Sequence, residues 1–294
     1  MKKYLTMAIF AILAVACSNE TELINQVNNN DTLVPVRVHV DGFNVGQEEF
    51  PATRATALTN YNDVNAVTLA FYDGNTEKYK VTQLRSDNTT YTTFGSFNLS
   101  LPMGSYTMVV VAYYTNENSV LTLTSPTEAS FSPRARETFA TTQTVNITST
   151  DAVDISATLD RIISCLKVVS TDNRTANVSN VRMTLSAGGK SFNPTTGLAT
   201  VNTGFANTVS ISAAPGNPSN STTYLFLATD EQTMNVTIET LDAEGNTLTT
   251  STVNNVPFKR NRVTILTGAM YTNSGIAGSF QVNTTWLSDA SMSF

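Results

Sequence analysis

The chain has 294 residues, with 17 lysine and arginine side chains, 23 aspartate and glutamate side chains, and a formal net charge of −6. This acidic balance disfavours nucleic acid as a partner, because phosphate binding requires clustered lysine and arginine. The length exceeds that of one typical domain and suits two domains that each bury a core.

The N-terminal segment resembles a bacterial lipoprotein signal. Two lysines follow the first methionine, and an apolar run covers residues 4–16. This run is shorter than the roughly 20 apolar residues that span a bilayer, so it predicts a cleaved signal peptide over residues 1–16. Leu13-Ala14-Val15-Ala16 resembles a lipobox, which predicts lipidation of Cys17 and export to the cell outer membrane. An ordinary secretory peptide is the alternative.

Residues 17–31 predict a lipidated cysteine followed by a flexible linker. They are polar, include three consecutive asparagines, and offer nothing to pack. Such a linker has an r.m.s. reach on the order of 20 Å. Glu20 and Glu22 resemble the acidic signals of surface-exposed lipoproteins in Bacteroidales, although a solvated linker explains them equally well.

From residue 32 the chain consists of short alternating runs separated by turn residues, which is typical of β-sandwiches. Four valines share one face of the first run, namely Val34, Val36, Val38 and Val40. Pro35 lacks an N–H, so it places this strand at an edge or at the point where pairing begins. The run over residues 108–113 is apolar on both faces, which predicts that something covers its outer side.

The pattern divides the chain into two parts. Residues 115–140 hold two prolines and several charges, and predict mostly loop with one short strand. A second set of strands opens after residue 160. We therefore predict an N-terminal β-sandwich over residues 32–155 and a C-terminal β-sandwich over residues 156–294. The fold class is all-β, with two tandem sandwiches of a transthyretin-like type.

The sequence contains no recognisable catalytic constellation. The single histidine, His39, lies in a strand-like segment without a nucleophile motif. Cys165 lies in an apolar run over residues 162–166, which predicts a small buried side chain. We predict no enzymatic activity, no cofactor and no metal.

The C-terminal residues alternate as a β-strand does. Apolar and small side chains recur at every second position from Ile276 to Trp286, and the same phase continues through Ala290, Met292 and Phe294. Added to another sheet, such a strand would gain main-chain hydrogen bonds and side-chain pockets. Residues 276–286 are expected to end the second sandwich, and residues 287–294 are the better candidate for a donated strand.

Several short segments, taken in their order, carry a family resemblance. They are the lipobox with Cys17, residues 34–40, residues 53–56, residues 101–110, residues 159–164 and residues 256–264. Together they resemble the Bacteroidales fimbrillins, also called type V pilins, with their anchor and accessory subunits. The resemblance covers nearly the whole chain.

This resemblance implies a fimbrillin-like fold and assembly with other fimbrial subunits by strand exchange, in support of adhesion. In such pilins a protease cuts after a basic residue in the first domain, the first strand leaves, and a C-terminal strand of another subunit fills the groove. Arg54, followed by Ala55, matches the cut position, and Arg134 and Arg136 are competing sites. The strand with the four valines is then exchangeable, and the donor tail includes Trp286.

Three functional hypotheses remain open. The chain is either a processed subunit of a fimbrium, or an uncleaved anchor or tip subunit that keeps its lipid at Cys17. A glycan-binding surface lipoprotein is the other possibility, but such sites usually present aromatic platforms and the chain has one tryptophan. The expected partners are other fimbrial subunits, the outer membrane through the lipid, and a host or bacterial surface glycan or protein receptor.

Overall fold

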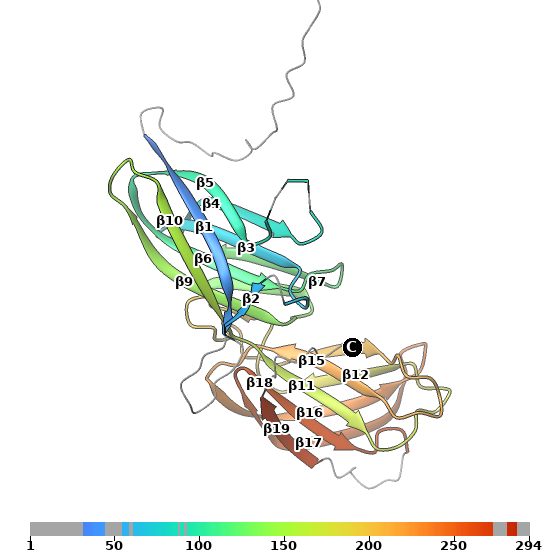
Figure 1. Cartoon of the computed structure of the whole chain (residues 1–294). Helices are drawn as coiled ribbons and strands as arrows, with labels where there is room; N and C mark the ends of the chain where they lie inside the picture. Colours follow the sequence, from blue (N-terminus) through green and yellow to red (C-terminus); the bar gives the residue numbers. More distant parts are fainter. Residues whose placement is uncertain are drawn as a thin grey trace, which may run out of the picture.

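The computed structural model describes residues 32–44, 55–58, 61–87, 89–90, 93–272 and 281–286. Every named element in these residues is a β-strand, so the all-β prediction is confirmed. Figure 1 shows two bodies, one above the other, which we call the N-terminal unit (residues 32–161) and the C-terminal unit (residues 162–286). The described part of the chain holds no helix long and apolar enough to cross a membrane. The predicted signal peptide, Cys17 and the linker lie outside the described residues.

The described residues of the N-terminal unit form ten strands. They are β1 (Leu33–Asn44), β2 (Ala55–Ala57), β3 (Ala66–Asp73), β4 (Thr76–Leu84), β5 (Ser96–Pro102), β6 (Gly104–Tyr113), β7 (Ser119–Ser125), β8 (Glu128–Pro133), β9 (Thr138–Ile147) and β10 (Val153–Arg161). One layer has the order β4-β3-β6-β9, and the other contains β10 and β1, with β5 and the short β2 both paired to β1. The layers join at a corner, where β9 and β10 pair only at residues 139–140 and 160–161.

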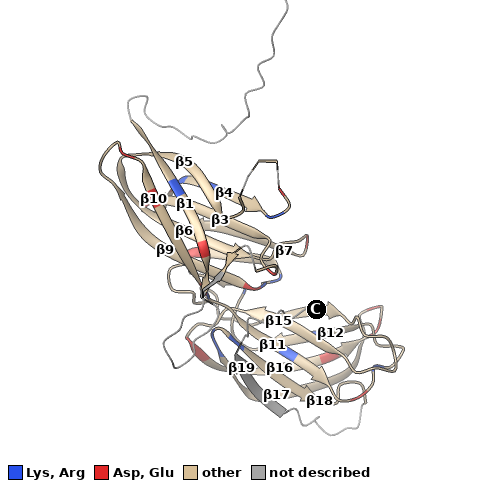
Figure 2. Ribbon diagram, viewed as in Figure 1, with Lys and Arg blue, Asp and Glu red and all other residues tan. Residues whose placement is uncertain are grey.

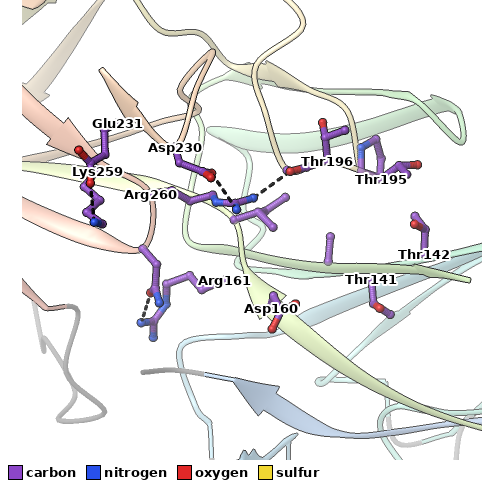
Figure 3. A pocket seen from close by; sticks show the side chains of 15 residues that line it. Thr141, Thr142, Asp160, Arg161, Thr195, Thr196, Asp230, Glu231, Lys259 and Arg260 are labelled. Atoms are coloured by element: carbon purple, nitrogen blue, oxygen red, sulfur yellow. Dashed lines mark hydrogen bonds and ion pairs between the residues drawn. The ribbon is translucent and has the colours of Figure 1, made fainter. Parts of the chain in front are cut away.

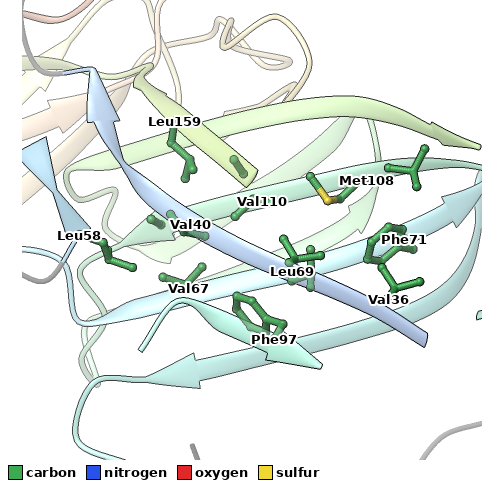
Figure 4. Close-up of a cluster of buried hydrophobic side chains, with 14 of the residues drawn as sticks. Val36, Val40, Leu58, Val67, Leu69, Phe71, Phe97, Met108, Val110 and Leu159 are labelled. Carbon is green, nitrogen blue, oxygen red and sulfur yellow. The ribbon is translucent and has the colours of Figure 1, made fainter. Parts of the chain in front are cut away.

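The core of the N-terminal unit lies between these layers. Figure 4 shows Val36 and Val40 of β1 among Leu69, Met108 and Val110 of the opposite layer. Successive residues of a strand point to opposite faces, so every second side chain of β1 enters this core.

The C-terminal unit, as far as the structure describes it, has nine strands. They are β11 (Ser164–Ser170), β12 (Asn180–Leu185), β13 (Ser191–Phe192), β14 (Phe205–Ser210), β15 (Asn220–Leu225), β16 (Glu231–Leu241), β17 (Thr247–Lys259), β18 (Arg262–Gly268) and β19 (Gln281–Trp286). One sheet has the order β15-β11-β18-β19, and the other has the order β14-β12-β16-β17. Buried apolar residues from both sheets, among them Leu166 and Ile238, form one cluster. Figure 2 shows that long stretches of strand in both units carry no charged residue.

A small third sheet joins the two units. β8 pairs with β7 on one side and with β13 of the C-terminal unit on the other. The rings of Phe192 and Phe226 stack with centroids 4.2 Å apart, and Phe131 of β8 stacks on both. These residues form one buried cluster with Val109 and Val111 on the outer face of β6. The predicted cover over residues 108–113 is thereby confirmed, and the shared cluster opposes movement of one unit against the other.

Two expectations about the elements differ from the structure. Residues 115–140, expected to be mostly loop, contain β7, β8 and the start of β9. Their prolines end or connect strands, and the burial of Leu123 and Phe131 against the outer face of β6 holds these strands in place. The expected division between residues 155 and 156 falls inside β10, which pairs with β1 as far as Asp160. We propose that the division lies at residues 162–163, where the chain changes sheet.

Candidate functional site

The first strand occupies a groove in the N-terminal unit. β1 pairs in parallel with β10 over residues 36–44 and antiparallel with β5 over residues 33–39. β2 continues the β5 side by pairing with residues 42–44. Pairing with β10 begins one residue after Pro35, so the missing N–H lies where only β5 accompanies the strand. Loss of β1 would therefore leave β5 and β2 without a partner strand and one edge of β10 unpaired.

The inner face of β1 is fully buried. Val34 and Val36 are 0% exposed, and Val38 and Val40 are 1% exposed. The structure thus brings the four predicted valines together in one core. Burying a valine stabilises by roughly 1.5–3 kcal/mol, so the four together approach the ~5–15 kcal/mol stability of a domain. A groove that loses them must be refilled.

The outer face of β1 is polar and solvent-exposed. Arg37 Nη1 lies 3.2 Å from Asp154 Oδ1 of β10, and both side chains are more than half exposed. His39 Nδ1 lies 2.8 Å from Ser96 Oγ of β5. A shallow pocket of about 310 Å³ lies over these residues. Exposed ion pairs contribute about 0–1 kcal/mol, so the inner face decides how firmly β1 is held.

β1 ends in a cluster of three aromatic rings. A β-bulge between Val40 and Gly42 shifts the alternation, so Phe43 enters the core three positions after Val40. The Phe43 centroid lies 4.3 Å from that of Phe139 and 5.4 Å from that of Tyr61. Phe43 and Phe139 are both 0% exposed. In Figure 1 this end of β1 lies where the two units meet.

A buried ionic cluster lies beside the rings. The Arg161 guanidinium lies 4.9 Å from the Phe139 centroid, and its Nε lies 2.8 Å from Glu137 Oε1. The Tyr61 hydroxyl donates to Glu137 Oε1 at 2.7 Å and accepts from Arg161 Nη2 at 2.9 Å. Arg161 Nη1 donates to Asn261 Oδ1 at 3.1 Å. Because Asn261 belongs to the C-terminal unit, this cluster connects the end of β1 with the second unit.

Burial governs the protonation of this cluster. The Arg161 and Glu137 side chains are 1% and 11% exposed. Burial raises the pKa of Glu137 above its ordinary value, although Arg161 and the Tyr61 hydroxyl favour the carboxylate. Burial and the Glu137 charge also raise the pKa of Tyr61. Removing one partner of such a buried pair typically costs about 3–5 kcal/mol, so the cluster is sensitive to partial loss.

The predicted processing bond joins Arg54 to Ala55. Arg54 lies outside the described residues, whereas Ala55 begins β2 and pairs with Asn44 at the end of β1. A cut at this bond would separate β1 from β2 along the chain, and the groove alone would hold β1.

The competing arginines lie in a packed segment. Ala135 and Glu137, which follow Arg134 and Arg136, are 5% and 9% exposed. The backbone carbonyl of Arg134 accepts from Ser119 Oγ at 2.9 Å, and that of Arg136 accepts from Thr138 Oγ1 at 2.7 Å. Proteolysis requires accessible backbone that is not bound in this way. This packing disfavours cleavage after either arginine.

The C-terminal strand lies at the end of its sheet. β19 pairs antiparallel with β18, and Trp286 stands opposite Arg262. Residues 281–286 thus form the last strand of the second sandwich, as expected for this part of the chain. Ala290, Met292 and Phe294 lie outside the described residues.

One carboxylate fixes the chain ahead of β19. Asp172 accepts the backbone N–H groups of Met270, Tyr271 and Thr272 at 2.8, 2.8 and 2.9 Å. Burial disfavours the charge on Asp172, but these hydrogen bonds outweigh it and lower the pKa of the carboxyl. Met270 and Tyr271 are also buried, so the chain is held as far as Thr272.

A polar cleft of about 740 Å³ lies where the units meet (Figure 3). Arg260 Nη2 lies 2.8 Å from Asp230 Oδ1, and Arg260 Nη1 donates to the Thr196 carbonyl at 2.8 Å. Lys259 pairs with Glu231 nearby. The lining of the polar cleft, as far as the structure describes it, contains no aromatic side chain that could serve as a sugar platform.

No sequence pattern predicted the residues that lie at the end of the β1 groove. Tyr61, Glu137, Arg161 and Asn261 come from separate segments, and no spacing connects them. Only Arg161 carried a sequence signal for burial, because it is a charge directly before an apolar run. Cys165 in that run is fully buried, as predicted, and burial raises the pKa of its thiol.

Comparisons with known proteins place the fold. The model of a family of unknown function, DUF6562, matches residues 34–291. None of the curated proteins matches the chain. A candidate adhesin from Bacteroides ovatus has 9% sequence identity and a TM-score of 0.51, with 90% of this chain and 98% of that chain covered. A second candidate adhesin from Bacteroides ovatus has 11% identity and a TM-score of 0.50, with coverage of 77% and 83%.

The fimbrial anchor protein Mfa2 from Porphyromonas gingivalis also matches, at 10% identity and a TM-score of 0.48, over 85% of this chain and 95% of that chain. The two Bacteroides structures show that this chain shares the fold of Bacteroidales adhesin-type proteins. The predicted all-β sandwich fold is therefore confirmed, and these two Bacteroides proteins share it.

Proposed function

The chain belongs to the DUF6562 family, and we propose that it is a structural subunit of a cell-surface fimbrium that assembles by strand exchange in support of adhesion. One observation carries this proposal: β1 is an internal strand whose four inner valines are at most 1% exposed. The candidate-adhesin names of the two Bacteroides proteins of the same fold support a role at the cell surface. The role is structural and not enzymatic.

The proposed assembly begins with processing after Arg54. The cut leaves β1 bound only through its ladders with β10, β5 and β2, and through its buried face. When β1 leaves, β10 and β5 expose unpaired N–H and carbonyl groups on either side of an apolar groove. An extended strand from another subunit restores both ladders and refills the core.

The donated strand in this proposal is the C-terminal tail of a second copy. β19 pairs with β18 and ends at Trp286, and in this proposal residues 287–294, which follow it in the sequence, serve a neighbour. Their alternation of Ala290, Met292 and Phe294 suits a groove that accepts every second side chain. The precursor would be tethered to the outer membrane through Cys17 and would enter the fimbrium after processing.

The first test is the N-terminus of the protein on its native cell surface, measured by intact mass and N-terminal sequencing. We expect a chain that begins at Ala55 and carries no lipid. Arg54→Gln should abolish this product, whereas the matched controls Arg134→Gln and Arg136→Gln should leave it unchanged. Fibres built from chains that still contain β1 would contradict strand exchange.

A second test addresses the donor. Deletion of residues 287–294 should leave the subunit folded and processed but unable to polymerise, as judged by electron microscopy and by ladders on mild-denaturing gels. Polymers of normal length from the deleted chain would show that the tail is not the donated strand.

The integration of β1 in its sheet also favours a second role, that of an uncleaved anchor or tip subunit. In this role β1 stays as a permanent strand and the lipid on Cys17 holds the protein at the outer membrane. Recovery of full-length lipidated chain from assembled fibres would support this role in place of the first.

A further inference from the structure

The far end of the β1 groove is built to hold a ring. We call the site formed by Tyr61, Phe139, Glu137 and Arg161 the ring socket, and Phe43 fills it in this structure. The ring of Phe43 lies 4.3 Å from Phe139 and 5.4 Å from Tyr61, centroid to centroid. Valines line the rest of the inner face of β1, so the ring socket is the one position on that face that takes a large aromatic side chain.

Within the ring socket, the aromatic rings lie directly against the buried charges. Behind Phe139 and Tyr61, the Arg161 side chain is 1% exposed and contacts the Glu137 carboxylate. A small side chain in place of Phe43 would open space beside this ion pair and admit water to it. A valine pocket emptied in the same way would be lined by apolar groups, so the two losses have different consequences.

The ring socket also reaches the C-terminal unit. Arg161 Nη1 donates to Asn261 Oδ1 at 3.1 Å, and the Asn261 N–H donates to the Ile163 carbonyl at 2.9 Å. Asn261 has a φ of 59°, in the left-handed region that asparagine tolerates better than most residues. It lies in the turn between β17 and β18, and the next residue, Arg262, pairs with Trp286 of β19. The turn that contacts the ring socket thus leads into β18, which pairs with β19, the strand that precedes the tail.

We propose that the ring socket is the specificity-determining site of the β1 groove. A strand that fills the groove must deliver an aromatic ring to it, and the ring's presence is transmitted to the β17–β18 turn through Arg161 and Asn261. This inference rests on the proposed strand exchange. Its occupant in the fibre is Phe294 of a second copy, the only ring in the eight residues after Trp286. The ring socket lies at the C-terminal end of β1, so a tail that runs in the same direction as β1 brings its last residue there.

Peptide competition tests the recognition. The full-length chain is cut at Arg54, and a fluorescent peptide of residues 32–44 is exchanged into the groove. The Phe43→Ala peptide should compete at least about 100-fold more weakly than the unchanged peptide, because truncating a buried phenylalanine is among the costliest core changes. Phe43→Trp should keep most of the affinity, and Val36→Ala is the matched control with the smaller loss. Equal competition by Phe43→Ala and Val36→Ala would overturn the proposal.

The tail is tested in the same assay. A peptide of residues 281–294 should displace the labelled strand, and Phe294→Ala should weaken it more than Met292→Ala does. If Phe294→Ala has no effect while the tail still binds, the tail does not use the ring socket and its assignment as occupant is wrong.

Hydrogen exchange on the uncleaved chain tests the transmission. Phe43→Ala should speed exchange at the Asn261 amide and along β18, whereas Val36→Ala should leave these amides at the unchanged rate. If no peptide enters the cleaved protein, strand exchange fails, and the uncleaved variants alone decide whether Phe43 controls the turn. If peptides enter without regard to the ring, strand exchange stands and the ring socket is wrong.

Discussion

The first and last strands of the described chain are held in different ways. β1 has neighbours on both edges and a fully buried inner face, whereas β19 stands at the end of its sheet with β18 as its neighbour there. Removal of an internal strand opens a groove between its two neighbours. Removal of an edge strand exposes only one neighbour, and the rest of the sheet stays paired. Under the proposed strand exchange, the acceptor groove lies in the N-terminal unit, and the strand that precedes the donated tail lies in the C-terminal unit.

The largest loss of stability is expected from a charge on the inner face of β1. Val38→Asp should lower the free energy of unfolding by about 5 kcal/mol or more, because it buries an unpaired carboxylate in the core. Urea denaturation followed by tyrosine and tryptophan fluorescence measures the loss. A midpoint like that of the unchanged protein would mean that β1 does not complete this core.

The buried ionic cluster of Tyr61, Glu137 and Arg161, beside the end of β1, should show the next largest effect on stability. Glu137→Ala removes the acceptor of Arg161 and Tyr61 and should cost about 3–5 kcal/mol, because it leaves the buried guanidinium without its carboxylate. Glu137→Gln keeps an acceptor for the Tyr61 hydroxyl and should cost less. Thermal unfolding of both variants measures which loses more stability. If Glu137→Ala leaves the melting temperature unchanged, the cluster does not bind the units together.

The contacts that hold residues 270–272, ahead of β19, should contribute less to the free energy of unfolding. Asp172→Ala removes the acceptor of three backbone N–H groups and should cost about 1–3 kcal/mol. Hydrogen exchange should report it as faster exchange at Met270, Tyr271 and Thr272, with no change along β1. Faster exchange along β1 as well would mean that the two ends of the chain are not held separately.

The Asp172 carboxylate also makes the stability of the segment ahead of β19 depend on pH. The pKa of Asp172 is lowered in the folded chain, so its stabilisation is complete above the unfolded value near 4 and is lost as the pH falls through the folded value. The difference in melting temperature between the unchanged chain and Asp172→Asn should therefore shrink as the pH falls from 7 to 3. A difference that stays constant over this range would contradict the assignment.

The smallest effect belongs to the outer face of β1. Arg37→Ala breaks an ion pair with Asp154 in which both side chains are more than half exposed, and should cost less than about 1 kcal/mol. It serves as the matched control for Val38→Asp on the neighbouring position of the same strand. A large loss from Arg37→Ala would mean that polar contacts, and not the valines, hold β1.

Local patterns predicted much of the fold. Alternation identified β1 and its inner valines, since a half-buried strand repeats every second residue. The two-faced apolar run of β6 predicted a cover on its outer side, which β7, β8 and the C-terminal unit supply. The same reasoning predicted only one short strand in residues 115–140, where prolines and charges resemble a loop, and it missed β8, which burial against β6 stabilises.

The candidate site could be predicted only in part. The four valines were found because they are close in sequence, but their ladder partner β10 is remote, with Arg37 and Asp154 separated by 117 positions. The ring socket was missed because Tyr61 and Arg161 are 100 positions apart and nothing in their spacing brings them together. A buried charge resembles an exposed one until its partners are known.

The sequence by itself determined most of the strand content, the inner face of β1 and the burial of Cys165, because each depends on the hydrophobicity and period of neighbouring residues. Only the tertiary structure decided that β1 is internal, that its end packs against buried charges, and that β8 and β13 unite the two units. These features depend on which distant strands become neighbours, and that choice is made by the packing of whole layers.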